Sequence, residues 1–262
     1  GRRSLMPRPS AGLVPDWPAP AGVRALFSTR EGGASVQPFD SFNLGDHVRD
    51  DPHAVAANRA RLASWTAPAR PVFLQQVHGT GVVHLSHATP DGTEADGCVV
   101  QGPGLAATIM VADCLPVLFA HASGQAVAAA HAGWRGLAQG VLEATLHALR
   151  QAAGEGDVVA WLGPCIGPSA FEVGAEVRQA FVAADIEAAA CFRSHGRDGK
   201  YWADLPALAR RRLQAAGVAQ VHGNDGSDAW CTVTQDSRFF SHRRDAVRLG
   251  STGRMAACVW ID

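Results

Sequence analysis

The chain has 262 residues, of which 47% are hydrophobic, enough for a continuous core in one large α/β domain or two small ones. Its 23 basic and 24 acidic residues nearly cancel, which excludes a global field that favours nucleic acid, an anionic membrane or a strongly acidic substrate. No apolar run has the length of a signal-peptide core or a membrane span, so we expect a cytoplasmic protein with no nucleic-acid or membrane partner.

The chain shows no internal repeat and no low-complexity linker, which predicts a single domain. We expect residues 1–22, rich in proline, arginine and small residues, to be an N-terminal extension, and residues 23–262 to be the catalytic domain. Residues 1–5 precede the first methionine, Met6, and carry no weight in the fold. The six cysteines include no C-x-x-C pair, which favours free thiols over disulfides.

The first elements in the chain are turn-rich loops at residues 28–33 and 41–45, followed by a helix. Asp51 before Pro52 is typical of an N-cap followed by proline at the first helical position, and the helix is predicted to end near Trp65. Such a helix is expected to cover one face of a sheet.

The central third alternates between strand and helix patterns. Short apolar runs predict strands at residues 105–111, 115–120 and 126–130, and a helical pattern then continues from Leu137 to Ala148 with Gly154 beyond its end. A further strand is predicted at 158–162. This order is a β-loop-α-β unit, in which functional loops follow the carboxyl ends of strands, where His131 lies.

The last third predicts helices at residues 175–185 and 203–216 and strands at 218–222 and 254–261. The final strand is apolar nearly throughout, which favours a central place in its sheet. We expect mixed sheets with some antiparallel pairing.

Three turn segments each carry a side chain that can bind a metal: His78, Cys114 and His131. Two imidazoles and one thiolate suit Zn²⁺, and three protein ligands leave a fourth position open, as in catalytic zinc sites. The spacing matches no short zinc motif, so a turn-capping His78, a core Cys114 and a His131 bonded to a backbone carbonyl stay open as alternatives.

Five motifs occur in an order that resembles the YfiH-like, laccase-domain family from about Phe27 to the C-terminus. They are Gln76-Val77-His78-Gly79, Ala112-Asp113-Cys114-Leu115-Pro116, His131-Ala132-Gly133-Trp134-Arg135-Gly136, Gly163-Pro164-Cys165-Ile166-Gly167-Pro168 and Phe240-Ser241-His242-Arg243-Arg244-Asp245. The resemblance implies that His78, Cys114 and His131 are the metal ligands and the catalytic centre.

The resemblance also implies a four-layer α/β/β/α sandwich with mixed sheets, of the CNF/YfiH-like α/β type. It implies one zinc ion, phosphate as co-substrate, and purine nucleoside phosphorylase activity on adenosine, inosine, guanosine and methylthioadenosine, together with adenosine deaminase activity. The expected partner is thus a small nucleoside, with no obligate protein partner. Some bacterial members are instead named peptidoglycan editing factors.

Both reactions have candidate residues. Zinc lowers the pKa of a bound water to about 7, which suits attack on C6 of adenosine. Phosphorolysis needs hydrogen-bond donors for the phosphate, and Arg30 and Arg135 are the candidates. Arg30 lies in a glycine-rich loop, and Arg135 lies four residues after His131. We expect Asn43 to bond a ribose or base edge and Asp113 to orient a ligand histidine.

Three other functions compete for the same residues. Multicopper oxidases need clustered imidazoles, and the 11 histidines include no H-x-H pair, so we reject laccase chemistry. A cysteine hydrolase would use Cys114 as its nucleophile with His78 or His131 as the base. A cell-wall-precursor binding or editing factor would use the zinc only to shape a pocket, without purine turnover.

Overall fold

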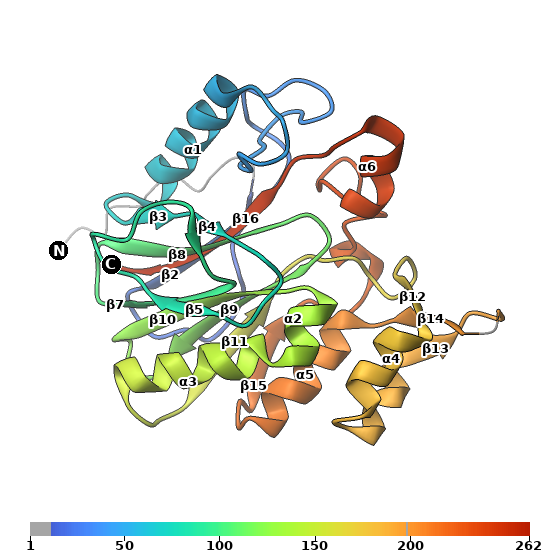
Figure 1. The fold of residues 1–262 in the computed structure, drawn as a ribbon. Helices are drawn as coiled ribbons and strands as arrows, with labels where there is room; N and C mark the ends of the chain where they lie inside the picture. Colours follow the sequence, from blue (N-terminus) through green and yellow to red (C-terminus); the bar gives the residue numbers. More distant parts are fainter. Residues whose placement is uncertain (1–11, 198) are drawn as a thin grey trace.

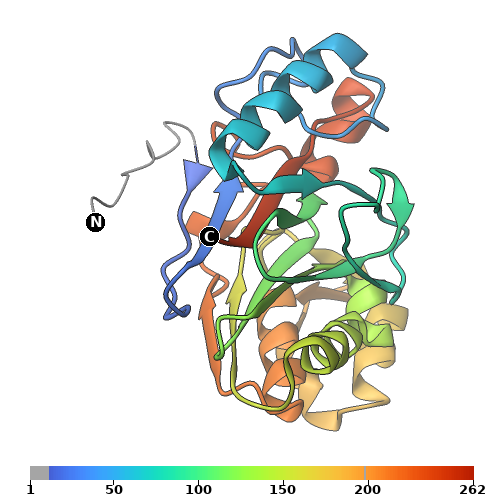
Figure 2. The same ribbon diagram turned by 90° about the vertical axis from the view of Figure 1, so that its left-hand side faces the viewer.

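Two β-sheets packed face to face, with helices on both outer faces, make up the fold (Figures 1 and 2). The computed structural model describes residues 12–197 and 199–262. The order helix, sheet, sheet, helix confirms the expected four-layer α/β/β/α architecture with mixed sheets. No helix in these residues is long and apolar enough to cross a membrane.

The first sheet has five strands with the C-terminal strand at its centre. In sheet order they are β1 (Gly12–Leu13), β2 (Val23–Ser28), β16 (Met255–Ile261), β8 (Leu105–Val111) and β3 (Arg70–Val72). Strand β16 pairs antiparallel with β2 and β8, as expected for a buried central strand, whereas β3 is parallel to β8. Of the expected N-terminal extension, residues 1–11 lie outside the described residues.

The second sheet has six strands and contains the expected β-loop-α-β unit. In sheet order they are β15 (Gln220–Gly223), β11 (Val158–Leu162), β9 (Leu115–His121), β10 (Ala126–Ala132), β7 (Gly97–Gln101) and β5 (Val82–His84). Strands β10 and β11 are both antiparallel to β9, which lies between them, so they are parallel to each other. The connection between them carries the chain across the outer face of the sheet.

Helix α1 (Pro52–Thr66) covers the first sheet and starts as the sequence predicts. The side chain of Asp51 accepts a hydrogen bond from the backbone N–H of His53, and Pro52 stands at the first position. The helix expected after His131 is instead two helices, α2 (Trp134–Gln139) and α3 (Val141–Ala153). Gly140 separates them with a φ of 105°, a left-handed conformation that glycine adopts without strain.

The remaining elements are short strands, helices and turns outside the two main sheets. They are the strands β4 (Leu74–Gln75), β6 (Thr93–Glu94), β12 (Glu172–Gly174), β13 (Phe192–Ser194) and β14 (Lys200–Ala203), the helices α4 (Ala175–Val182), α5 (Leu205–Ala215) and α6 (His242–Leu249), and the 3₁₀ turns η1 (Ile186–Cys191) and η2 (Asp228–Trp230). The helix expected at 175–185 therefore ends three residues early, and α5 falls inside its expected range.

The apolar runs of the central strands reflect burial on both faces. On β9, Leu118 faces the layer between the two sheets with Phe27 and Trp161, whereas its neighbour Phe119 faces the helices with Leu146. Successive side chains of a strand point to opposite faces, so a strand covered on both sides has no polar alternation. The two sheets and their helices thus form a rigid frame for the loops at their edge.

Replacing Leu118 by alanine should open a cavity between the sheets. Its side chain is fully buried, so we expect the free energy of unfolding to fall by about 2–5 kcal/mol, measured by urea denaturation. Val247→Ala is the control, because Val247 is 98% exposed on α6 and its loss should change stability by less than about 0.5 kcal/mol. Equal unfolding midpoints for the two variants would contradict this packing.

Candidate metal centre and its pocket

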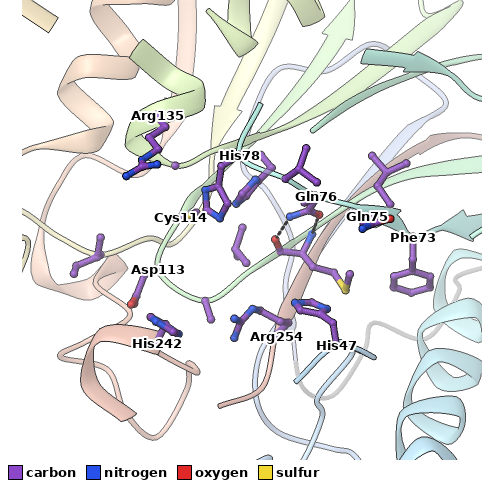
Figure 3. Close-up of a pocket in the computed structure, with 18 of the residues that line it drawn as sticks. His47, Phe73, Gln75, Gln76, His78, Asp113, Cys114, Arg135, His242 and Arg254 are labelled. Carbon is purple, nitrogen blue, oxygen red and sulfur yellow. Dashed lines mark hydrogen bonds between the residues drawn. The ribbon is translucent and has the colours of Figure 1, made fainter. Parts of the chain in front are cut away.

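The three candidate metal ligands lie together at the edge where the two sheets meet. His78 is in the loop after β4, Cys114 is in the turn that takes the chain from β8 to β9, and His131 is near the end of β10. Their ligand atoms all lie within 4.8 Å of one another. It is the one group of this kind within residues 12–197 and 199–262. Figure 3 shows His78 and Cys114 close together in the pocket.

Two non-glycine residues at the site have a left-handed backbone. His78 has a φ of 59° and Asp113, beside Cys114, has a φ of 110°. Such conformations cost about 1–3 kcal/mol each and persist only where surrounding contacts enforce them. The hydrogen bonds of both residues therefore show which contacts stabilise the backbone of the site.

A fully buried carboxylate, that of Asp96, joins the two histidine segments. Its Oδ2 accepts hydrogen bonds from His131 Nδ1 at 2.8 Å and from the backbone N–H of His78 at 3.0 Å. Its Oδ1 accepts from the backbone N–H groups of Val77 and Gly79, both at 3.0 Å. Because Nδ1 of His131 is bonded to Asp96, Nε2 is the nitrogen left for a metal.

Charge in the cluster favours a bound cation. Burial lowers the pKa of His131, but the negative charge of Cys114 and the hydrogen bonds with Asp96 and Cys114 outweigh it and raise that pKa to about 9. Burial and the nearby His131 lower the pKa of His78. Burial opposes ionisation of Asp96, yet its hydrogen bonds from His131, Gly79 and Val77 keep the pKa of this carboxyl below its ordinary value. A metal ion can replace the proton that this arrangement otherwise holds on His131.

Gly133, just before α2, leaves the space that the cluster fills. A Cβ at this position would lie 2.9 Å from His78 Nδ1 and 3.0 Å from Cys114 Sγ. The donor set of two imidazoles and one thiolate, the convergence of the three atoms and the carboxylate behind His131 all fit an open metal site.

A pocket of about 890 Å³ opens beside the cluster. Its wall combines apolar side chains such as Phe73, Met110 and Phe171 with charged groups. The charged lining residues are four arginines and two carboxylates: Arg59, Arg135, Arg243, Arg254, Asp46 and Asp113. The excess of positive charge favours an anionic ligand or an anionic part of one.

Of the two arginines expected to bind phosphate, only Arg135 lines this pocket. Arg135 is exposed, and its guanidinium carbon lies 5.2 Å from the centre of the Trp134 ring. The expectation for Arg30 is corrected: it lies outside the lining of the pocket and donates to the backbone carbonyls of Asp40 and Asp236. Those bonds tie the early glycine-rich loop to the C-terminal part of the chain.

Asn43, expected to bond a ribose or base edge, is fully buried and holds the backbone of its own loop. Its Nδ2 donates to the carbonyl of Gly45 and to Asp50, and its Oδ1 accepts from the N–H groups of Gly45 and Arg254. Its amide is thus used within the protein, and the substrate contact expected for it is corrected.

Asp113, expected to orient a ligand histidine, points elsewhere. Its Oδ1 accepts from Thr232 Oγ1 at 2.7 Å and its Oδ2 from the backbone N–H of Arg243 at 2.6 Å. Burial raises the pKa of this carboxyl. Asp96 takes the expected role, and Asp113 instead fixes the turn that presents Cys114.

The family can now be stated from three comparisons. The family model described as multi-copper polyphenol oxidoreductase laccase matches residues 24–262, and this chain belongs to that family, as the YfiH-like motifs predict. A purine nucleoside phosphorylase of Pseudomonas aeruginosa is 53% identical over 96% of this chain and 99% of its own length. Purine nucleoside phosphorylase YfiH of Escherichia coli is 50% identical over 95% and 98%, respectively.

Solved structures have the same fold. A crystal structure of a Neisseria meningitidis protein has a TM-score of 0.87 and 45% identity, and the match covers 96% of this chain and 99% of that one. YlmD from Geobacillus stearothermophilus has a TM-score of 0.87 at 31% identity, covering 98% of each chain. These structures confirm the expected fold class.

Replacing Asp96 by asparagine should loosen the histidine segments. The amide keeps one acceptor oxygen where the carboxylate receives four donors, so we expect a loss of about 2–4 kcal/mol in unfolding free energy and a roughly 10- to 100-fold weaker metal affinity. Urea denaturation and metal titration measure the two effects.

Asp91→Asn is the matched control for Asp96→Asn. Asp91 is an exposed carboxylate that accepts one backbone N–H, that of Phe73, and its change should leave metal affinity as in the wild type. Equal metal affinities in all three proteins would refute the role of Asp96.

Proposed function

We propose that this chain is a zinc-dependent purine nucleoside phosphorylase that acts on adenosine, inosine, guanosine and methylthioadenosine, with adenosine deaminase activity at the same site. The observation that carries the proposal is the convergence of His78, Cys114 and His131 at a pocket of about 890 Å³, a size suited to a small organic substrate. The names of relatives at 50–53% identity over nearly their whole length support the purine substrate.

The protein's part in this chemistry is to hold and expose the zinc ion. His78, Cys114 and His131 would bind it, and Asp96 keeps His131 in the tautomer that presents Nε2. Zinc bound by three protein ligands can polarise a substrate group or activate a water in its open position. The turns fixed by Asp96 and Asp113 keep the three ligands together without rearrangement.

Phosphorolysis forms a bond between a phosphate oxygen and C1′ of the ribose and breaks the bond from C1′ to the base nitrogen, and the base leaves with a proton. Negative charge has to be brought into the pocket for this reaction. The four arginines of the lining, against two carboxylates, supply the compensating charge. The apolar wall around Phe73 and Met110 suits the flat face of a purine.

Laccase chemistry is not part of this proposal, despite the family's description. The part of the chain that the structure describes has one three-ligand group, whereas multicopper oxidases need a copper site for electron transfer and a separate cluster for oxygen. The group here also has the mixed imidazole and thiolate donors that suit zinc.

A cysteine hydrolase is the second candidate, because the ligand atoms of Cys114 and His131 lie within 4.8 Å of each other, a proximity that also suits a thiolate and its base. Metal content separates the two. Stoichiometric zinc that is lost in Cys114→Ser supports a metal ligand, whereas an active metal-free protein with a covalent adduct at Cys114 supports the hydrolase.

The test of the proposed function is incubation of the zinc-loaded protein with adenosine, with and without phosphate, following adenine, inosine and hypoxanthine by chromatography. We expect phosphate-dependent release of the base, and loss of at least 100-fold of this activity in Cys114→Ser because the ligand set is broken. Inosine formed without phosphate would report the deaminase activity. Absence of every product would overturn the purine assignment and favour a cell-wall precursor as ligand.

Substituting Gly133 should remove zinc although the three ligand residues themselves stay unchanged. In Gly133→Ala the new methyl group would lie about 3 Å from both His78 Nδ1 and Cys114 Sγ, so we expect less than about a tenth of the wild-type zinc content by elemental analysis. Gly81→Ala is the matched control, since a Cβ at Gly81 meets nothing within 4 Å. Full zinc occupancy in Gly133→Ala would show that the metal binds elsewhere.

A further inference from the structure

Arg254 lies in the wall of the metal pocket, directly before the central strand β16. Figure 3 shows its side chain between His47 and His242, in the cavity beside Cys114. Among the described residues, no carboxylate lies within 4.0 Å of its guanidinium. A half-buried arginine without a carboxylate partner is unusual, because a buried charge is ordinarily paired.

The stem of Arg254 is held in place by the loop at residues 41–45. Its backbone N–H donates to Asn43 Oδ1 at 2.8 Å, and its carbonyl accepts from the N–H of Leu44 at 3.1 Å. A Cβ at Gly45 would lie 2.9 Å from Arg254 Cγ, so this glycine makes room for the side chain. The loop thus positions the arginine.

The guanidinium itself is anchored at one end only. Nη1 donates to the carbonyls of Thr252 at 3.3 Å and Gly253 at 3.1 Å. Nε and Nη2 have no partner within the described residues and are not among the fully buried unpaired atoms. Two N–H groups on one edge of a fixed guanidinium are a fork that matches two oxygens of a phosphate.

The other charged groups of the lining are already engaged or less fixed. Arg59 donates to the carbonyl of Leu44 and lies 3.6 Å from Asp46, whose charge it offsets. Arg243 donates to the carbonyl of Glu172, and Arg135 is exposed.

Arg254 is also coupled to the metal cluster. Burial lowers its pKa, and the charges of Cys114 and Asp113 raise it, while Arg254 in turn lowers the pKa values of His47 and His78. Arg254 lines the same pocket as His47 and the metal-binding group.

We propose that Arg254, held by Asn43 and Gly45, is the residue that binds inorganic phosphate in this pocket, through Nε and Nη2. That the phosphate is the co-substrate rests on the proposed function. Arg254 thereby takes the role that the sequence analysis gave to Arg30 and Arg135, and Asn43 becomes a positioning residue.

The direct test is calorimetric titration of inorganic phosphate into zinc-loaded wild type, Arg254→Gln and Arg248→Gln. We expect the dissociation constant to rise roughly 10- to 100-fold in Arg254→Gln, as for loss of a charged hydrogen-bond pair. Arg248 is an exposed arginine of α6 outside the pocket, and its variant should bind phosphate as the wild type does. Unchanged affinity in Arg254→Gln, or no binding to the wild type, would overturn the proposal.

A second variant tests the positioning without removing the charge. Gly45→Ala should weaken phosphate binding several-fold, because its methyl group displaces the Arg254 stem. In Arg254→Gln, the zinc content and the thermal stability should stay as in the wild type. Gly81→Ala again serves as the glycine control. Normal phosphate affinity in Gly45→Ala would contradict the role given to the loop.

Kinetics separate this inference from the proposed function. If both hold, Arg254→Gln raises the KM for phosphate in phosphorolysis roughly 10- to 100-fold, whereas Arg248→Gln leaves it as in the wild type. Phosphate binding that depends on Arg254 in a protein without purine turnover would overturn the proposed function alone. Phosphate-dependent turnover that is indifferent to Arg254→Gln would overturn this inference alone.

Discussion

The buried carboxylate of Asp96 holds together segments that lie far apart in the sequence, and the site depends on it. Removing a carboxylate from water is costly unless donors replace the lost hydration, and here four donors from the His78 loop and His131 do so. The same bonds enforce the left-handed backbone of His78 and fix the tautomer of His131. Fold and ligand geometry are therefore coupled through one side chain.

The site is built on buried strands of the two sheets. Cys114 is at the crossing from one sheet to the other, and His131 is part of a strand buried on both faces. Gly133 gives the space for the cluster, and Asp113 fixes the turn before Cys114. Around this neutral-to-anionic cluster the pocket wall is positive, with Arg254 held by its own loop. In the function proposed here, this arrangement joins a metal position to an anion position within one cavity.

Local sequence patterns predicted the features that depend on neighbouring residues in the chain. The sequence predicted the cap at Asp51, the apolar runs of the buried strands and the candidate group of His78, Cys114 and His131. Long-range partners were not predicted: Asp96 reads as any acidic residue before an apolar strand, and Arg254 as one arginine among many. Asn43 and Arg30 stand in loops typical of binding sites, yet both bond the backbone of their own surroundings. The sequence pattern predicted one helix through Gly140, but the left-handed backbone of this glycine divides it into α2 and α3.

The central claim is that His78, Cys114 and His131 bind one zinc ion with an open position. X-ray absorption at the zinc edge of the purified protein tests it most directly, because it reports the atoms bound to the metal and their distances. The account predicts one sulfur at about 2.3 Å and nitrogen or oxygen atoms at about 2.0–2.1 Å. A zinc environment without sulfur, or with several sulfurs, would contradict it.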